Sequence, residues 1–221
     1  MRPEPRAENA ARTLALLDGD LPSLVMAGIL AERAGGGGPR PLALVIGNGP
    51  QREAATTMAG VLGLGCCAAE APAFLDGPTG LARGLLELAE IAIGARCHRV
   101  ALPWVASVHG TGEAGATHQA AVEGSDEAGT IARLALWHDT ALLTSRLLLV
   151  QGVEFEFELP LVDLEPAQLA DLAIDMDLAP DLCWWARAGR SNPGDLLGKS
   201  EAAEACRVVW EPLLATMRAE G

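Results

Sequence analysis

The sequence predicts a doubly wound α/β fold, Rossmann-like, in which a parallel sheet carries helices on both faces. Short apolar runs of strand type alternate along the chain with longer helical patterns, as in successive βαβ units. The chain has 221 residues and is half hydrophobic, so it can bury one full core. We therefore expect residues 1–221 to form a single α/β domain, with residues 1–12 as an N-terminal tail.

Five short apolar runs are the strand candidates, at 13–17, 42–46, 65–68, 99–104 and 154–159. The first predicted helix, 22–34, begins with a proline and ends at a run of glycines. Helices 51–62 and 79–93 have apolar residues at three- and four-residue spacing, and each is followed by glycine. Further helical patterns occupy 131–149, 166–176 and 200–218.

Residues 106–130 are rich in Gly, Ala and acidic residues and show no periodicity, which predicts a long loop. A loop of this length is typically a functional lid or a disordered segment. At its end, Asp126 and Glu127 follow Ser125, a pattern that favours a helix start over contact with a substrate.

Charge and composition exclude several partners. Sixteen basic against 29 acidic residues give a net charge of −13, so we expect no nucleic-acid surface. No run approaches the roughly 18 apolar residues of a membrane span, and the N-terminus has no signal-peptide pattern, which favours a cytoplasmic protein. The five cysteines are scattered and odd in number, so reduced thiols are expected rather than disulfides.

The segment LDGDLPSLVMAGILAER (17–33) has the outline of a phosphate-binding turn, because a strand, a tight turn and a helix N-terminus follow one another. However, Asp18 and Asp20 would repel a phosphate by a few kcal/mol each, at about 4 Å and an effective dielectric near 20. A helix cap without ATP chemistry is the favoured interpretation, since Asp is a preferred cap and Pro22 suits the first turn.

Three stretches together resemble motifs of one enzyme family. The Ser-Gly-Gly-x-Asp-Ser loop keeps Gly19 and Ser23, and an Asp-Tyr-Gly-Gln-Arg motif is echoed by Gly49, Gln51 and Arg52. The late Pro-Leu-x-Asp-Leu-x-Lys-x-Glu motif is matched at Pro160, Leu161, Asp163 and Leu164, with Pro166 and Gln168 replacing the lysine and glutamate. From about residue 13 to residue 207 the chain resembles the 7-cyano-7-deazaguanine synthases of queuosine biosynthesis, which are PP-loop ATP pyrophosphatases of the adenine nucleotide alpha hydrolase-like group.

The resemblance also covers the family's zinc segment, which carries four cysteines. Here Trp184 and Cys206 are kept, while Ala186, Leu197 and Ser200 replace the other three thiols. A structural zinc ion needs about four thiolate or imidazole ligands, so we expect no zinc. Residues 178–221 are therefore predicted to be a degenerate zinc segment followed by the C-terminal helix.

The resemblance implies an enzyme that adenylates 7-carboxy-7-deazaguanine and introduces nitrogen from ammonia to form a nitrile, with ATP and Mg²⁺. Because the phosphate loop, the late lysine and the zinc cysteines have all changed, we expect a pseudoenzyme without catalytic residues or cofactor, which acts as a binding or assembly protein. The resemblance also implies a homodimer.

The alternative is a divergent ATP-dependent ligase or amidotransferase that acts on a deazapurine or another carboxylate. It would use a cleft at the carboxyl ends of the strands, with Mg²⁺ between Asp18, Asp20 and phosphate. The residues that would line this cleft are Gly19, Ser23, Gln51, Arg52 and Trp104.

Other chemistry has weaker support. The four histidines (His98, His109, His118 and His138), taken with Cys97, match no zinc spacing, and no Gly-x-Ser-x-Gly motif marks a hydrolase. On an extended segment the adjacent Trp184 and Trp185 would face opposite sides, and core packing is the favoured interpretation for both.

Overall fold

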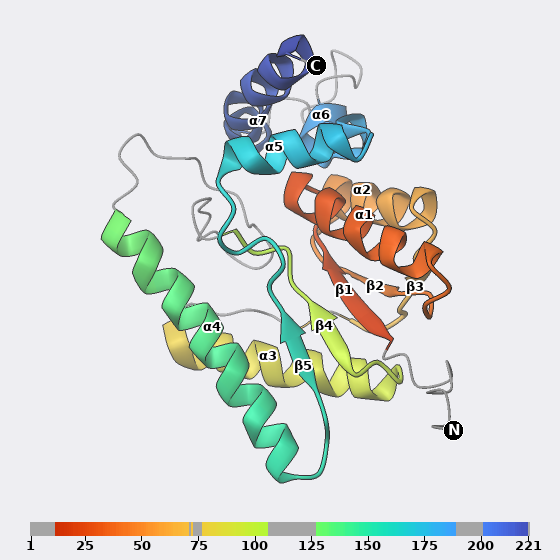
Figure 1. The fold of residues 1–221 in the computed structure, drawn as a ribbon, viewed down its shortest axis with the longest axis vertical. Coiled ribbons are helices and arrows are strands. Elements are labelled where there is room, and N and C mark those ends of the chain that lie inside the picture. The colour runs from red at the N-terminus through yellow and green to blue at the C-terminus, as the bar shows by residue number, and fades with distance from the viewer. Residues whose placement is uncertain (1–11, 71, 73–76, 106–126, 189–200, 221) are drawn as a thin grey trace, which may run out of the picture.

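The computed structural model describes residues 12–70, 72, 77–105, 127–188 and 201–220 and contains a five-stranded parallel sheet (Figure 1). The strand order is β3-β2-β1-β4-β5, so β2 and β3 extend the sheet on one side of β1, and β4 and β5 extend it on the other side. The strands are β1 (Thr13–Leu17), β2 (Leu42–Val45), β3 (Gly65–Cys66), β4 (Arg99–Ala101) and β5 (Glu156–Glu158).

Helices cover both faces of this sheet. The helices α1 (Leu21–Gly35) and α2 (Gly49–Val61) lie on one face, and α3 (Gly77–Gly94) and α4 (Glu127–Val150) lie on the other (Figure 1). In the central strand, Ala15 and Leu17 join the core under α1 and α2, while Leu14 and Leu16 join the core under α3 and α4. The predicted doubly wound α/β class is confirmed.

The C-terminal part of the chain adds a further layer beside α1 and α2 (Figure 1). It consists of α5 (Pro166–Asp175), the 3₁₀ turn η2 (Pro180–Leu182), α6 (Trp184–Ala188) and α7 (Glu201–Glu220). The approach is close at Gly28 of α1, where a Cβ atom would lie 3.0 Å from Leu178 and 3.1 Å from Met176. With the sheet on one side and this layer on the other, every residue from Leu21 to Gly28 is buried. An apolar surface all round is what such a helix requires.

Several predicted boundaries were wrong. The apolar runs at 65–68, 99–104 and 154–159 exceed the strands they contain, because burial continues beyond the last ladder pair, as at Leu102 and Trp104. The predicted loop 106–130 ends too late, since α4 already begins at Glu127; residues 106–126 lie outside the described ranges. Trp184 and Trp185 stand on a short helix rather than on an extended segment, and both are buried as predicted.

None of the described helices has the length and apolar character needed to cross a membrane.

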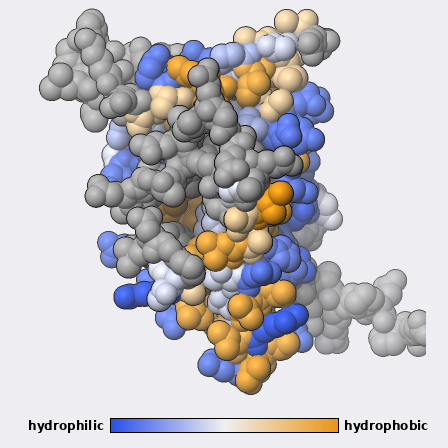
Figure 2. Space-filling model, turned by 90° about the vertical axis from the view of Figure 1, so that its left-hand side faces the viewer, coloured by the Kyte–Doolittle hydropathy of each residue, from blue (hydrophilic) through white to orange (hydrophobic). Residues whose placement is uncertain are grey.

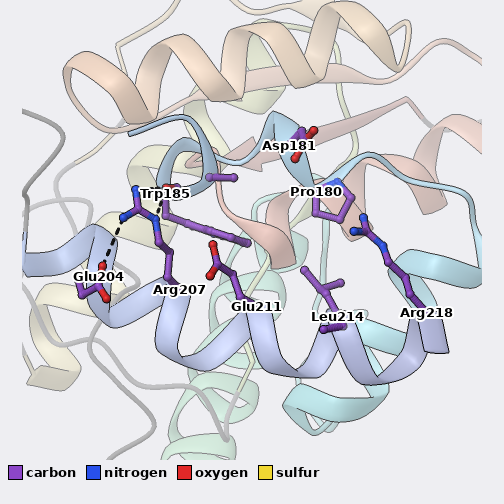
Figure 3. Close-up of a pocket in the computed structure, with 10 residues that line it drawn as sticks. Pro180, Asp181, Trp185, Glu204, Arg207, Glu211, Leu214 and Arg218 are labelled. Carbon is purple, nitrogen blue, oxygen red and sulfur yellow. Dashed lines mark hydrogen bonds and ion pairs between the residues drawn. The ribbon is translucent and has the colours of Figure 1, made fainter. Parts of the chain in front are cut away.

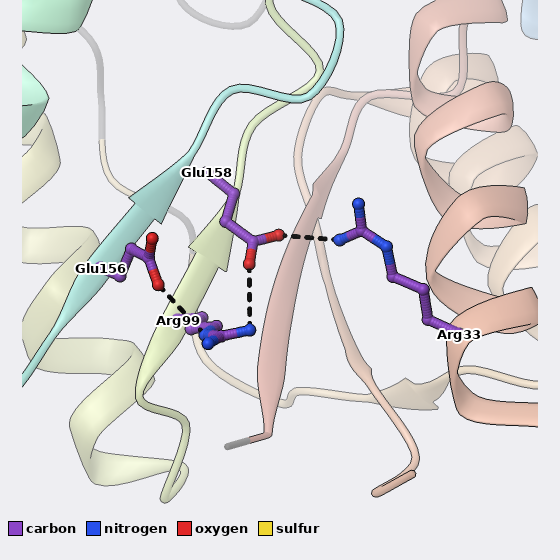
Figure 4. Close-up of polar contacts among 4 residues, drawn as sticks. All are labelled: Arg33, Arg99, Glu156 and Glu158. Atoms are coloured by element: carbon purple, nitrogen blue, oxygen red, sulfur yellow. Dashed lines mark hydrogen bonds and ion pairs between the residues drawn. The ribbon is translucent and has the colours of Figure 1, made fainter. Parts of the chain in front are cut away.

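The edge strand β5 is tied to the sheet by ion pairs (Figure 4). Arg99 of the neighbouring strand contacts Glu156 at 3.2 Å and Glu158 at 3.3 Å, and Glu158 also contacts Arg33 at the end of α1 at 3.1 Å. Charged side chains along an edge strand disfavour pairing with a further strand.

The contact between α1 and the C-terminal layer predicts that Gly28→Val destabilises the protein by about 1–3 kcal/mol, because the added methyl groups meet Leu178 and Met176. The matched control is Gly60→Val, since the space around Gly60 of α2 is open, and there the change should stay within about 0.5 kcal/mol. Urea unfolding measures both variants. Equal midpoints for the two would contradict the close packing of this layer on α1.

Candidate functional site

The turn between β1 and α1 occupies the position where doubly wound folds bind ligands. It follows the carboxyl end of the central strand, next to β4, and the sheet order reverses between these two strands. At such a switch point the loops diverge and leave a crevice for a ligand. The residues Asp18, Gly19 and Asp20 form this turn, and α1 begins at Leu21.

The carboxylates of the turn accept hydrogen bonds from its own donors. Asp20 caps α1, since its Oδ1 accepts the backbone N–H of Ser23 at 3.0 Å. Asp18 Oδ1 accepts the backbone N–H of Asp20 at 3.2 Å and the hydroxyl of Ser23 at 2.6 Å. The Ser23 hydroxyl oxygen in turn accepts the backbone N–H of Asp18 at 3.1 Å. The cap predicted from the sequence is confirmed, because the carboxylate of Asp20 accepts one of the first N–H groups of α1, that of Ser23.

Gly19 is required by both its conformation and its surroundings. Its φ of +84° lies in the left-handed region, and a Cβ atom would lie 2.5 Å from the carbonyl oxygen of Gln51 and 3.0 Å from Ala54 Cβ. Its carbonyl oxygen accepts the backbone N–H of Trp184 at 2.9 Å. The turn is thus held between the first turn of α2 and the start of α6.

Residues around α6 cover the turn. Burial raises the pKa of the Cys183 thiol well above its usual value, and the nearby carboxylates of Asp20 and Asp18 raise it further, while Arg187 lowers it. The Arg187 guanidinium donates to the carbonyl oxygen of Asp181 and to the hydroxyl of Thr57, both at 3.3 Å. Beneath this cover Asp18 and Asp20 are each 1% exposed.

The predicted site residues do not all converge on the turn. Ser23 and the main chain of Gln51 contact it, as described above. Arg52 is exposed on α2, and its side chain makes no hydrogen bond or ion pair within the described ranges. Trp104 packs against Trp137 of α4, with ring centroids 5.1 Å apart, in the core on the other face of the sheet from α1.

Sequence reasoning missed the role of Cys183 and Arg187, which belong to the segment assigned to a former zinc site. No local motif signals that this segment returns to the β1–α1 turn. Cys206, the one thiol that the resemblance compares with a zinc ligand, is buried in the same apolar cluster as Trp185 and Trp210. No cluster of three or more potential metal ligands occurs within the described ranges; His98 and His138 are exposed there, while His109 and His118 lie outside them.

A pocket of about 650 Å³ lies between η2, α6 and α7 (Figure 3). Arg207 of α7 donates to the carbonyl oxygen of Trp185 at 3.0 and 3.1 Å and contacts Glu204 at 3.3 Å. Glu211 and Arg218 of the same helix also line the pocket, so its wall carries charges of both signs. A smaller pocket of about 480 Å³ lies beside α4. The turn residues line neither of these two pockets.

Comparison of the sequence with protein-family models finds no match, and comparison with curated proteins finds none either. The geometry of the β1–α1 turn and of the residues that cover it is therefore the basis for a function.

The geometry at Gly19 predicts that Gly19→Ala destabilises the protein by more than about 1 kcal/mol, through backbone strain and the clash with Gln51. Gly63→Ala is the matched control, because Gly63 also has a positive φ, of 73°, but a Cβ atom added there would have nothing within 4 Å. Urea unfolding should show the larger loss for Gly19→Ala. A loss no larger than that of Gly63→Ala would contradict the contact with α2.

The raised pKa of Cys183 predicts a loss of stability at alkaline pH. The folded state holds this thiol neutral, so its contribution is complete below the pKa of the unfolded thiol, about 8.5, and declines as pH rises above it. Between pH 7.5 and 9.5, under reducing conditions, the wild type should lose about 1 kcal/mol that Cys183→Ala does not lose. Urea unfolding at the two pH values measures this difference, and equal losses in both proteins would contradict the prediction.

Proposed function

We propose that this protein is a degenerate relative of the 7-cyano-7-deazaguanine synthase-like ATP pyrophosphatases that has lost ATP chemistry and acts as a binding or assembly protein. The observation that carries the proposal is the pairing of N–H groups at the β1–α1 turn with carboxylates of the chain: Asp18 accepts the N–H of Asp20, and Asp20 accepts the N–H of Ser23 in α1. In a phosphate loop these N–H groups face the nucleotide. Here they bind carboxylates that are part of the chain.

Electrostatics and steric cover both oppose a phosphate at this position. A phosphate oxygen about 4 Å from either carboxylate would meet a repulsion of about 4 kcal/mol at an effective dielectric of 20. To reach the turn, a nucleotide would also have to displace α6, which is held by the bond from Trp184 to Gly19 and by the contacts of Arg187. The repulsion and the steric cover thus both act at the β1–α1 turn.

A second altered motif supports the same conclusion. In the late motif, Pro166 and Gln168 stand where the family has lysine and glutamate. In this protein Gln168 Oε1 accepts the backbone N–H of Glu165 at 2.8 Å, as half of a capping box at the start of α5, and Pro166 occupies its first turn. The residues at both altered motifs thus stabilise helix starts.

The alternative, a divergent ATP-dependent ligase, requires Mg²⁺ between Asp18, Asp20 and phosphate. Asp18 Oδ1 already accepts two hydrogen bonds within the turn, so a metal ion would have to compete with both. Of the other residues of that cleft, Arg52 is exposed on α2, and Trp104 packs against Trp137 in the core on the other face of the sheet.

The proposal predicts that ATP with Mg²⁺ does not stabilise the protein. A ligand at a hundred times its dissociation constant adds about 2.7 kcal/mol, so a thermal-shift titration to millimolar ATP detects even weak specific binding. The expected result is an unchanged melting temperature, compared with MgCl₂ alone. Saturable stabilisation that is lost in Ser23→Ala would overturn the proposal and favour the ligase. Pyrophosphate release with 7-carboxy-7-deazaguanine and ammonia would then identify the substrate.

A further inference from the structure

We propose that the pocket between η2, α6 and α7 binds a short peptide with free termini, about three residues long. In this arrangement Glu211 of α7 binds the ammonium group of the peptide and Arg218 binds its carboxylate. The inference goes beyond the proposed function, because it assigns a ligand to a site that shares no residue with the β1–α1 turn. It does not depend on whether that turn binds a nucleotide.

The first observation is a pair of opposite charges along one wall of the pocket (Figure 3). Glu211 and Arg218 are seven residues apart, which is two helical turns or about 10 Å along α7, so both lie on the same side of the helix. Both are exposed, and neither makes an ion pair or a side-chain hydrogen bond within the described ranges. By contrast, Arg207 is held by Glu204 and by the carbonyl oxygen of Trp185. On α7, Glu211 and Arg218 are therefore the pocket charges left for a ligand.

The surface between these two charges is apolar. Leu214, which lies midway along the helix, is 5% exposed, and Pro180 and Trp185 lie across from α7 (Figure 3). An extended chain spans about 3.3–3.6 Å per residue, so three residues match the spacing of Glu211 and Arg218. The pocket volume of about 650 Å³ lies within the usual range for ligand pockets, roughly 300–1,000 Å³. A tripeptide with an apolar middle residue thus fits the pocket in length, charge and surface.

A buried donor in the wall favours a peptide over other zwitterions. The indole Nε1–H of Trp185 is buried and, among the residues that the structure describes, has no hydrogen-bond acceptor. Buried polar groups in folded proteins are nearly always paired, so an unpaired one in a pocket wall indicates an acceptor supplied from outside the chain. The carbonyl oxygens of a peptide backbone are such acceptors. A zwitterion of the same length without amide groups lacks them.

The charge of the wall disfavours a phosphate-bearing ligand. Asp181 of η2 adds a second carboxylate to that of Glu211, and the pair formed by Arg207 and Glu204 is neutral. An ammonium group is attracted by both carboxylates, whereas a polyanion would be repelled by them and by the net charge of −13. A peptide whose two termini carry opposite charges suits this wall.

The pocket is also separate from the outer side of α4. That side exposes Leu142, Leu143, Leu147 and Leu149, and Figure 2 shows hydrophobic residues gathered on the lower part of the face that α4 occupies. The pocket lies instead in the C-terminal layer, above α1 and α2 in Figure 1. An association through α4 would leave the pocket open, so peptide binding is measurable with or without it.

Isothermal titration calorimetry of the full chain with the peptide Ala-Leu-Ala tests the proposal. We expect a dissociation constant of about 0.1–1 mM, since exposed ion pairs contribute little. Acetylation of the N-terminus of the peptide, or amidation of its C-terminus, should each weaken binding about threefold. The compound 8-aminooctanoate, which carries the same two charges but no amide group, should bind more weakly than the tripeptide.

Variants of the two charged residues show which terminus each of them binds. Glu211→Gln should bind the free peptide about threefold more weakly than the wild type does. It should bind the acetylated peptide as well as the wild type does, because the ammonium group is already absent. Arg218→Gln should behave in the same way toward the amidated peptide.

Matched controls separate this pocket from the rest of the surface. Glu90→Gln on α3 and Arg96→Gln just after it change exposed charges outside the pocket, and both variants should bind the peptide like the wild type. Ala215→Trp, at an exposed position that lines the pocket, should abolish binding by filling it. Circular dichroism confirms that each variant is folded.

Three results would each overturn the proposal. They are the absence of saturable binding up to about 10 mM peptide, equal affinities for the free, acetylated and amidated peptides, and binding of 8-aminooctanoate as tight as that of the tripeptide. None of these results depends on the ATP titration.

Discussion

The capping of α1 by Asp20, supported by Asp18, is the interaction on which the arrangement of this protein depends. The first N–H groups of a helix have no partner within the helix and must be satisfied from outside it. In most helices water can do this, but α1 lies between the sheet and the C-terminal layer, and its first residues are fully buried. Carboxylates supplied by the chain make that burial possible.

The cap and the cover over it are physically linked. With Asp18, Asp20 and Ser23 bonded to one another, the turn presents a closed surface against which Trp184 and Cys183 can pack. A phosphate loop needs the opposite, since its donors must stay open to the ligand. Packing α6 onto the turn and holding a nucleotide there are therefore competing uses of the same N–H groups.

Interactions between residues close in the sequence could be predicted from it, whereas interactions between distant residues could not. The cap joins Asp20 to Ser23, only three residues further on, and the alternation of strands and helices is a regular pattern. Both were therefore predictable. The bond from Trp184 to Gly19 joins distant parts of the chain and leaves no local signature. Strand ends were overestimated because apolar residues report burial, whereas a strand is defined by its hydrogen bonds. Leu102 and Trp104 are buried without extending β4.

The two faces of the sheet differ in how much apolar surface their covering helices leave exposed. On the side of α1, the apolar surface is covered by α5, α6 and α7, and the β1–α1 turn at the carboxyl end of the central strand is buried beside α6. On the other side, α4 has no comparable outer layer within the described ranges and still exposes its leucines. Burying apolar surface is the main favourable term in association, and more of that surface is exposed on α4 than at the β1–α1 turn. These two features, a turn whose donors are paired within the chain and a helix whose outer side is apolar, are the ones on which the proposed binding or assembly role rests.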